Sequence, residues 1–318
     1  MAVYTHLGAE DLARLIAEYD VGELVSAKGI AEGVSNSNWL IETTRGRYIL
    51  TMYERRIDIA QLPFFLGLLD HLAEHGCAVP GTVHDRSGAA SRTIDGKAVA
   101  LIEFLPGVSP DRATVAQAKA VGAALAKVHL AAQDFTPRRP NDLAPADTLA
   151  ILEKCGEEGL VSINIGLREV LPRGRKLVAQ WPQDLPASII HSDLFPDNVL
   201  MLDERVSGMI DFYFACHDMM AYDLAVTHAA WSFRGSDGAF DPAVGSALVA
   251  GYESIRTLEK EERAALPLLA QGACLRFVAS RAEDWLDTPD DAQVQRKDPM
   301  DFVRRWDFYA AQGDAAFA

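Results

Sequence analysis

The residue pattern changes at Pro106, and this change restricts the fold more than any other feature of the chain. Before it, residues 22–54 contain short strand-like runs separated by Gly, Ser and Asn, and residues 45–47 form a plausible hairpin turn. Residues 62–76 follow a helical pattern that ends at Gly76, as a C-cap would. Residues 90–107 indicate another hairpin. The sequence therefore predicts a small α+β lobe with an antiparallel sheet over residues 1–105.

Helical patterns dominate beyond Pro106, beginning with the Ala- and Leu-rich periodicity of residues 114–133. Only residues 187–202 and 205–215 contain convincing strands there, and these two short runs flank a loop rich in ionisable residues. Residues 136–180 are the hardest part to assign, because they begin as a loop and the helices that follow have weak caps. A second, larger and mainly helical lobe is predicted over residues 106–318.

Composition restricts the partners of the chain. It has 318 residues, 49% of them hydrophobic, and a formal net charge of −15, which disfavours a nucleic-acid or anionic-membrane partner, although a solvated acidic surface is the better explanation of the charge. The spacing of its four cysteines indicates neither a zinc site nor a disulfide framework. The N-terminus lacks the pattern of a signal peptide and no run of 18 apolar residues occurs, so we expect a cytoplasmic protein.

The stretch IIHSDLFPDNVL, residues 189–200, joins a strand-like run to a strongly polar loop. His191, Asp193 and Asn198 have the spacing H-x-D-x-x-x-x-N, and Asp211 follows thirteen residues after Asn198. Phosphoryl transfer needs a carboxylate to orient and deprotonate the attacking hydroxyl, and oxygen ligands for Mg²⁺. Asp193 fits the first role, and Asn198 and Asp211 fit the second. A single loop Asp is more often a turn or cap residue, but the joint spacing favours catalysis.

These segments resemble the kinase-like phosphotransferase family that includes the aminoglycoside and choline kinases. In detail, the sequence is similar to the bacterial homoserine kinase branch of this family. The similar segments are HSDLFPDNV, IDFYFAC and YDLA, together with EGVSNSNWLIET and LRFVASRAEDWLDTP, and the resemblance covers almost the whole chain. It implies a bilobal protein-kinase-like fold and ATP- and Mg²⁺-dependent phosphorylation of the L-homoserine hydroxyl, giving O-phospho-L-homoserine for threonine biosynthesis. It assigns Asp193 as the base, Asn198 and Asp211 as magnesium ligands, and His191 and Asp223 as supports of the catalytic loop.

The resemblance also places ATP between the lobes. The loop KGIAEGVSNSN stands where a phosphate-covering loop would, with Gly29 and Gly33 permitting unusual backbone angles and Ser35 and Asn36 offering donors. Taken alone, it reads as a Gly/Ser hairpin turn. The backbone of the connector Glu103, Phe104 and Leu105 would bind adenine, although a strand end before a Pro-Gly turn explains the same residues.

One position departs from the family pattern. In the wider family, the strand that corresponds to residues 47–53 usually carries a Lys or Arg that binds the α- and β-phosphates. In this chain Thr51 stands at that position. Lys28 and Arg47 are the nearby cations that could replace it, or magnesium and loop amides could carry more of the charge. The substitution leaves open a regulatory protein that binds nucleotide without turnover, although the intact Asp193, Asn198 and Asp211 set argues against it.

An amino-acid substrate needs a cation for its carboxylate and an acceptor for its ammonium group. Arg276 and Arg281 lie on a late helix and could supply the cation, but an intrahelical ion pair with Glu283 or Asp284 is equally compatible with the sequence. Other candidates for the acceptor pocket are Tyr213, His217 and Asp218, for which packing or turn formation is an equally good explanation. Choline, ethanolamine, an aminoglycoside or another small hydroxyl compound remain alternative acceptors, and the chain would act as a monomer or homodimer.

Overall fold

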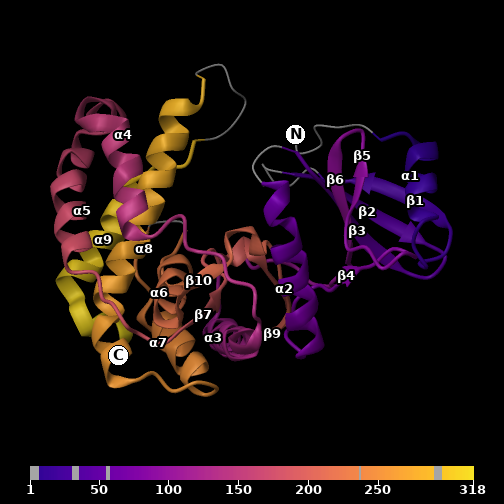
Figure 1. The fold of residues 1–318 in the computed structure, drawn as a ribbon. Helices are drawn as coiled ribbons and strands as arrows, with labels where there is room; N and C mark the ends of the chain where they lie inside the picture. Colours follow the sequence, from indigo (N-terminus) through magenta and orange to yellow (C-terminus); the bar gives the residue numbers. More distant parts are fainter. Residues whose placement is uncertain (1–6, 31–35, 55–57, 236–237, 290–295) are drawn as a thin grey trace.

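The computed structural model describes residues 7–30, 36–54, 58–235, 238–289 and 296–318, and it has two lobes (Figure 1). The smaller lobe holds an antiparallel sheet with the strand order β1-β2-β3-β6-β4, and β5 pairs with the other end of β6. Its strands are β1 (Leu24–Gly29), β2 (Asn36–Thr43), β3 (Arg47–Tyr53), β4 (Thr82–Val83), β5 (Arg92–Ile94) and β6 (Lys97–Glu103). The predicted hairpins are confirmed, with turns at residues 44–46 and 95–96.

Alternation along β3 divides the smaller lobe into two cores. Leu50 and Met52 point to the face that is covered by α1 (Ala9–Ile16), whose Leu12, Leu15 and Ile16 are buried against them. Tyr53 belongs to the opposite core, which contains Leu62 and Leu66 of α2 (Leu62–Glu74). The sheet is therefore packed on both faces, and α2 covers the side that faces the larger lobe (Figure 1).

Helix α2 contributes to the cores of both lobes. Leu68, Leu69 and Leu72 lie in the large core, whereas Leu62 and Leu66 pack under the sheet. The helix ends as predicted before Gly76, which has φ of 72° and adopts the left-handed conformation of a C-cap glycine. The division of the chain at residue 105 stays a prediction, since α2 is buried against both sides.

The larger lobe is mainly helical, as predicted. Its helices are α3 (Val115–Ala131), α4 (Pro145–Ile163), α5 (Val170–Ala179), α6 (Met220–Trp231), α7 (Pro242–Glu253), α8 (Lys260–Asp287) and α9 (Met300–Gln312). Helix α6 is buried along its whole length and lies at the centre of this core. Among the residues that the structure describes, no helix has the length and apolarity needed to span a membrane.

Four short strands position the polar loop on this helical core. β7 (Ala187–Ile190) pairs with β10 (Cys216–Met219), and β8 (Val199–Leu202) pairs with β9 (Arg205–Met209). The prediction of one continuous strand over residues 205–215 was wrong: β9 ends at Met209, and Asp211 has a left-handed backbone with φ of 65°. Asp tolerates this conformation better than most residues do, so the chain turns sharply there and changes direction between β9 and β10.

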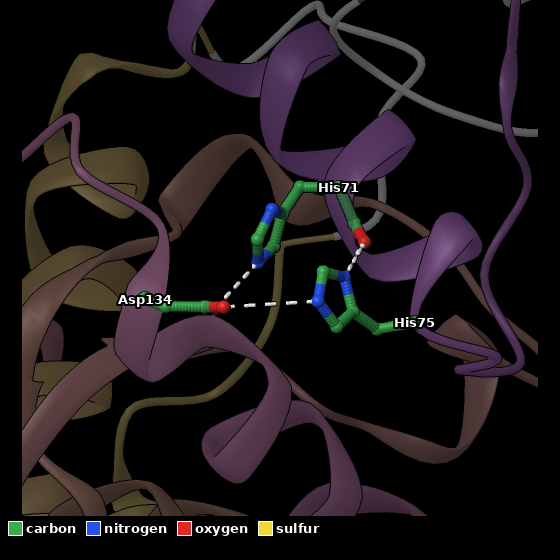
Figure 2. A group of neighbouring side chains, drawn as sticks. All are labelled: His71, His75 and Asp134. Atoms are coloured by element: carbon green, nitrogen blue, oxygen red, sulfur yellow. Dashed lines mark hydrogen bonds and ion pairs between the residues drawn. The ribbon is translucent and has the colours of Figure 1, made fainter.

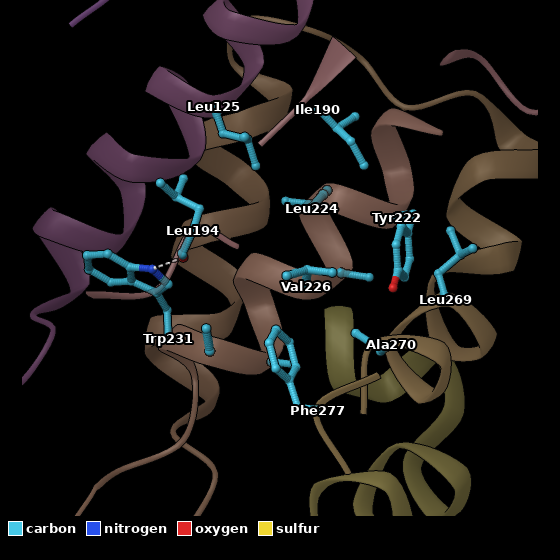
Figure 3. Close-up of a cluster of buried hydrophobic side chains, with 14 of the residues drawn as sticks. Leu125, Ile190, Leu194, Tyr222, Leu224, Val226, Trp231, Leu269, Ala270 and Phe277 are labelled. Carbon is cyan, nitrogen blue, oxygen red and sulfur yellow. Dashed lines mark hydrogen bonds between the residues drawn. The ribbon is translucent and has the colours of Figure 1, made fainter. Parts of the chain in front are cut away.

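The loop rests on buried apolar side chains. Leu194, the neighbour of Asp193, is fully buried, and its carbonyl accepts a hydrogen bond of 2.8 Å from the Trp231 indole (Figure 3). Ile190 at the end of β7 and Leu224 of α6 are also buried in this cluster (Figure 3). An apolar residue therefore anchors the loop immediately beside its central carboxylate.

Candidate active site

Asp223, in the first turn of α6, holds the start of the 191–198 loop. Its carboxylate accepts hydrogen bonds of 2.7 Å from the backbone N–H groups of His191 and Ser192, and lies 2.9 Å from His129 Nε2. Burial raises its pKa, but the His129 hydrogen bond and the nearby imidazoles outweigh burial, so the net pKa is lowered. Asp223 is thus a fully buried carboxylate that holds the loop backbone, and its supporting role in catalysis stays a prediction.

His191 links the two carboxylates of the motif. Its Nδ1 accepts from the backbone N–H of Asp193 at 3.2 Å, and its Nε2 lies 3.0 Å from the carbonyl oxygen of Ile210, the residue before Asp211. These partners require Nε2 to carry the proton and donate it, so the imidazole is neutral. Burial lowers the pKa of His191 and favours the same state. These contacts tie the side chain to the loop, and its role as a support rather than a proton carrier stays a prediction.

Arg276 of α8 lies beneath the loop. Its Nη1 donates to the backbone carbonyl and to Oγ of Ser192, the latter at 2.6 Å, and Nη2 lies 3.6 Å from the Asp193 carboxylate. The Phe214 and Phe277 rings flank the guanidinium at 5.2 and 5.0 Å. Arg276 is only 2% exposed and its described contacts are with the loop, so the structure places it as the counter-charge of Asp193 rather than in an open cavity.

Asp193, Asn198 and Asp211 come together at the ends of β7, β8 and β9. Asn198 donates through Nδ2 to the Asp193 carbonyl at 2.9 Å, and its own carbonyl accepts from Ile210 N at 3.0 Å. The Asn198 amide oxygen is consequently the atom that this side chain can offer to a metal. Burial raises the pKa of Asp193, although Arg276 opposes this shift.

The carboxylates form a site that favours a cation. The protein around Asp211 and the charges of Asp193 and Asp197 raise the pKa of Asp211 to about 7. Asp211 is nevertheless an exposed residue, so an ion can reach it. A divalent cation would relieve the mutual repulsion of these carboxylates, and carboxylate and amide oxygens are the ligands that Mg²⁺ prefers. The donor set of Asp211 and Asn198 therefore fits magnesium.

Only part of the predicted nucleotide loop falls within the described residues. Gly33 and Ser35 lie outside them, Asn36 is the first residue of β2, and Gly29 is extended at the end of β1, opposite Trp39. The unusual backbone angle expected of Gly29 is therefore not observed. The described ends of β1 and β2 form the hairpin that carries this loop.

The interlobe connector begins where β6 ends. The Glu103 N–H already donates to the Gly81 carbonyl at 3.0 Å, and the Arg47 guanidinium lies 4.5 Å from the centre of the Phe104 ring. Leu105 presses against β9, where a side chain at Gly208 would come within 2.7 Å of it. Both lobes therefore hold the connector. The Glu103 N–H already donates a hydrogen bond within the protein.

Thr51 occupies the position where the family pattern has a cation. It is buried in the centre of β3, and its hydroxyl donates to Asn38 Oδ1 at 2.8 Å. Lys28 is exposed on β1, whereas Arg47 is engaged with Phe104. The geometry therefore leaves Lys28 as the freer of the two cations suggested by the sequence.

A cavity of about 200 Å³ opens beside the 191–198 loop. Ser192, which precedes Asp193, lines it together with Tyr213 and Phe214, and its remaining walls come from Asp58, Gln61, Phe65, Arg139, Asn141, Asp142 and Leu143. Tyr213, a predicted substrate residue, also reaches across to the smaller lobe, with its hydroxyl 3.0 Å from that of Tyr53. Sequence reasoning missed the segment Arg139–Leu143, although RRPND is a polar stretch in a region assigned as loop.

The other predicted substrate residues divide into two groups. His217 and Asp218 of β10 hold the missed segment: the His217 N–H donates to the Arg139 carbonyl at 2.6 Å, and Asp218 accepts from Asn141 Nδ2 at 2.7 Å. They act on the cavity through that segment and are not among its lining residues. Arg281 lies elsewhere on α8, with its Nη1 3.1 Å from Asp301.

A second cluster of possible metal ligands lies away from this cavity, where α2 meets the end of α3 (Figure 2). His71 Nε2 is 3.0 Å from Asp134 and 2.8 Å from the Ala131 carbonyl, and His75 Nδ1 is 2.7 Å from the His71 carbonyl. Each imidazole already satisfies a carbonyl at a helix end. These contacts account for the cluster as hydrogen bonding between α2 and the end of α3.

Comparison with known proteins identifies the family. A model described as the phosphotransferase enzyme family matches residues 26–266. A homoserine kinase from Granulibacter bethesdensis is 50% identical over 316 residues, covering 99% of this chain and 98% of that protein. One from Nitrobacter winogradskyi is 49% identical over 314 residues, covering 98% and 96%.

Solved structures confirm the predicted kinase-like fold. The spectinomycin phosphotransferase APH(9)-Ia, bound to ADP and spectinomycin, is similar with a TM-score of 0.75 at 14% identity, covering 98% of this chain and all of that one. Amicoumacin kinase hAmiN, in complex with AMP-PNP, Ca²⁺ and Ami, gives a TM-score of 0.72 at 14% identity, with 96% of this chain and 94% of that one covered. The chain belongs to the phosphotransferase enzyme family, and its sequence places it beside the homoserine kinases within that family.

Proposed function

We propose that this protein is an ATP-dependent kinase that phosphorylates the side-chain hydroxyl of L-homoserine, giving O-phospho-L-homoserine for threonine biosynthesis. The observation that carries the proposal is the convergence of Asp193, Asn198 and Asp211 in a chain 50% identical to a homoserine kinase over nearly its full length. The spacing, the contacts and the family membership all favour the same reaction type.

Asp193 has the environment of a general base for this reaction. It is held by Leu194 in the core, by His191 at its backbone and by Arg276 near its carboxylate, so little reorganisation is needed when a hydroxyl binds. The carboxylate orients the hydroxyl and accepts its proton as the oxygen attacks the γ-phosphorus. Burial raises the pKa of Asp193, and the charge of Arg276 opposes this shift and so favours the ionised base.

Magnesium would be held by Asp211 and Asn198, and it supplies charge neutralisation on the phosphates of ATP when bound. The protein prepares this site through His191, which ties the Ile210 carbonyl to the 191–198 loop, and through the Ile210 N–H bond to Asn198. These contacts keep Asp211 and Asn198 adjacent before any ion arrives.

In this proposal the smaller lobe binds the nucleotide and the larger lobe binds the acceptor. Residues 1–105 cover the nucleotide with the β1–β2 hairpin, and the connector Glu103–Leu105 offers backbone groups to adenine. Residues 106–318 supply the catalytic loop and the acceptor cavity. A cavity of about 200 Å³ is smaller than the 300–1,000 Å³ typical of sites for drug-sized ligands, which favours a small acceptor over an aminoglycoside.

A coupled assay of ADP release tests the proposal. Purified protein with ATP and Mg²⁺ receives L-homoserine, L-threonine, L-serine, choline or kanamycin, and we expect the highest kcat/KM with homoserine. Asp193→Ala should lower turnover by several orders of magnitude while ATP still binds. Equal or better turnover of another acceptor would refute homoserine as the substrate. Unchanged function in Asp193→Ala would support a non-catalytic nucleotide-binding protein instead.

A further inference from the structure

The acceptor cavity has an asymmetric set of charges. Its described lining contains one cation, Arg139, and two carboxylates, Asp58 and Asp142. Arg139 and Asp142 form an ion pair on the cavity wall, and Phe65 closes one side of the guanidinium at 5.6 Å. A cation and an anion side by side complement a zwitterion, because each can exchange its partner for the opposite charge of the ligand.

Arg139 is fixed in this position by neutral groups. Its Nε donates to Gln61 at 2.7 Å, and its Nη1 donates to the Ala215 carbonyl at 3.3 Å. His217 and Asp218 hold the surrounding segment to β10. The guanidinium has five N–H donors, and these bonds together with the Asp142 contact use three of them. Arg139 can therefore bind a further carboxylate without giving up its supports.

Asp142 is the more exposed half of the pair. Its side chain is 56% exposed, whereas that of Arg139 is 17% exposed and packed against Phe65. A ligand carboxylate can displace Asp142 from the guanidinium, and the displaced Asp142 carboxylate is then available to an ammonium group. This exchange pairs the ligand carboxylate with Arg139 and the ligand ammonium with Asp142, whereas an acceptor that lacks a carboxylate has no group with which to displace Asp142.

We propose that this cavity is an α-amino-acid subsite in which Arg139 binds the α-carboxylate and Asp142 binds the α-ammonium of the acceptor. The inference rests on the proposed kinase function and adds the groups that choose the acceptor class. Ser192, the neighbour of Asp193 in the chain, lines the cavity, and the proposal requires the hydroxyl end of the ligand to lie at this side, toward the base. Arg139 would then discriminate amino acids from amino alcohols and choline, since an acceptor without a carboxylate leaves Asp142 bound to Arg139 and therefore unavailable to the ammonium group.

Two truncated acceptors separate the two contacts. 3-Aminopropan-1-ol is homoserine without its carboxylate, and 4-hydroxybutanoate is homoserine without its ammonium group. We expect Arg139→Gln to lower the preference for homoserine over 3-aminopropan-1-ol by about 100-fold in kcat/KM, because a charge-assisted, forked contact is lost. Asp142→Asn should lower the preference for homoserine over 4-hydroxybutanoate, with a smaller effect because this group is exposed.

Matched variants control for changes in the loop. Arg138→Gln removes the neighbouring guanidinium, which contacts the backbone carbonyls of Phe135 and Pro137, and should leave both preferences unchanged. Arg139→Lys keeps the charge but loses the fork, so its preference should lie between those of the wild type and Arg139→Gln. For variants with too little turnover, homoserine and 3-aminopropan-1-ol binding is measured by thermal shift in the presence of AMP-PNP.

The outcomes distinguish the subsite from the kinase function. If Arg139→Gln weakens both acceptors equally, Arg139 only shapes the loop and the subsite is refuted. The same conclusion follows if the variant keeps its wild-type preference. If the wild-type protein does not phosphorylate homoserine at all, the proposed function itself fails, whatever the Arg139 variants do.

Discussion

Asp211 exposes a conflict between metal binding and folding at a single residue. Its folded pKa of about 7 lies above the ordinary value of 3.8, so the folded protein holds a proton that the unfolded chain releases first. The contribution of Asp211 to stability is therefore fully present below about pH 4 and is lost as the pH rises toward 7. In the absence of a cation, the ionised carboxylate destabilises the folded state at pH 8.

Asp211→Asn should accordingly abolish activity but raise the melting temperature of the metal-free protein. We expect a larger gain at pH 8 than at pH 5, measured by differential scanning calorimetry in EDTA. Asn also tolerates the left-handed backbone at this position, so strain does not obscure the result. Asp203→Asn is the control, because Asp203 is also exposed and has a left-handed backbone with φ of 56°, but is not among the charges that raise the Asp211 pKa. A gain independent of pH would contradict the assignment of the raised pKa.

Arg276 provides a second prediction at the residue scale. Its charge lowers the pKa of Asp193, which burial raises, and a base must be ionised to act. Arg276→Met should move the acid limb of the kcat/KM profile to higher pH, so that activity recovers partly as the pH increases. Arg281→Met on the same helix is the control. Arg281 contacts Asp301 rather than Asp193, so this variant should leave the acid limb of the profile in place. A uniform loss at every pH would mean that Arg276 only supports the loop.

At the residue scale, sequence spacing located the three groups proposed for chemistry but not their partners. Asp193, Asn198 and Asp211 are recognisable because a short motif carries them. His129 braces Asp223 from 94 residues away, and Arg139 reaches the cavity only because β10 holds its segment. Such contacts depend on tertiary packing, so a single sequence contains no local signal for them.

At the scale of elements, α3 and α7 cross at a contact that only glycine permits. A Cβ on Gly122 of α3 would lie 2.0 Å from the Leu248 carbonyl, and one on Gly251 of α7 would lie 2.0 Å from the Lys119 carbonyl. Each helix therefore presents a glycine to the backbone of the other. The close approach positions α3, which carries His129, against the central core.

Gly122→Ala should destabilise the protein by about 3 kcal/mol, because the clash is with backbone that cannot move aside. Gly67→Ala in α2 is the matched control: the nearest atom to its new Cβ is 4.0 Å away. Since alanine favours helix over glycine, that variant should gain about 0.5–1 kcal/mol. Urea denaturation measures both values. Equal effects of the two substitutions would show that the α3–α7 contact is not tight in solution.

Local signals also explain which elements could be predicted. The β5–β6 hairpin has a turn at Asp95 and Gly96, and α2 has a clear apolar pattern with Gly76 at its end, so both were predicted correctly. Strands β7, β8 and β9 lie within the two runs that were predicted as strands, but their ends and the strand β10 were not predicted, because strands of four or five residues are too short to establish a period. The left-handed turn at Asp211 had no glycine or proline to mark it, and a continuous strand was expected there instead.

At the scale of the whole molecule, α2 couples the lobes. Leu62 and Leu66 complete the core under the sheet, while Leu68, Leu69 and Leu72 lie in the large core. Tyr53 and Tyr213 add a hydrogen bond of 3.0 Å between the lobes. Removing either lobe would expose apolar side chains of α2 to water, so neither core is complete alone. We therefore expect the two lobes to unfold in a single transition.

Leu72→Ala tests this coupling from the side of the larger lobe. Leu72 is fully buried in the large core, so its truncation should cost about 2–5 kcal/mol. If the lobes unfold together, amide hydrogen exchange in β2 and β3 should accelerate as well, although neither strand belongs to that core. Leu12→Ala in α1 is the reciprocal variant and should accelerate exchange in α6. Sheet amides that keep wild-type protection in Leu72→Ala would mean that the smaller lobe folds independently, and α2 would then be a hinge rather than a shared core element.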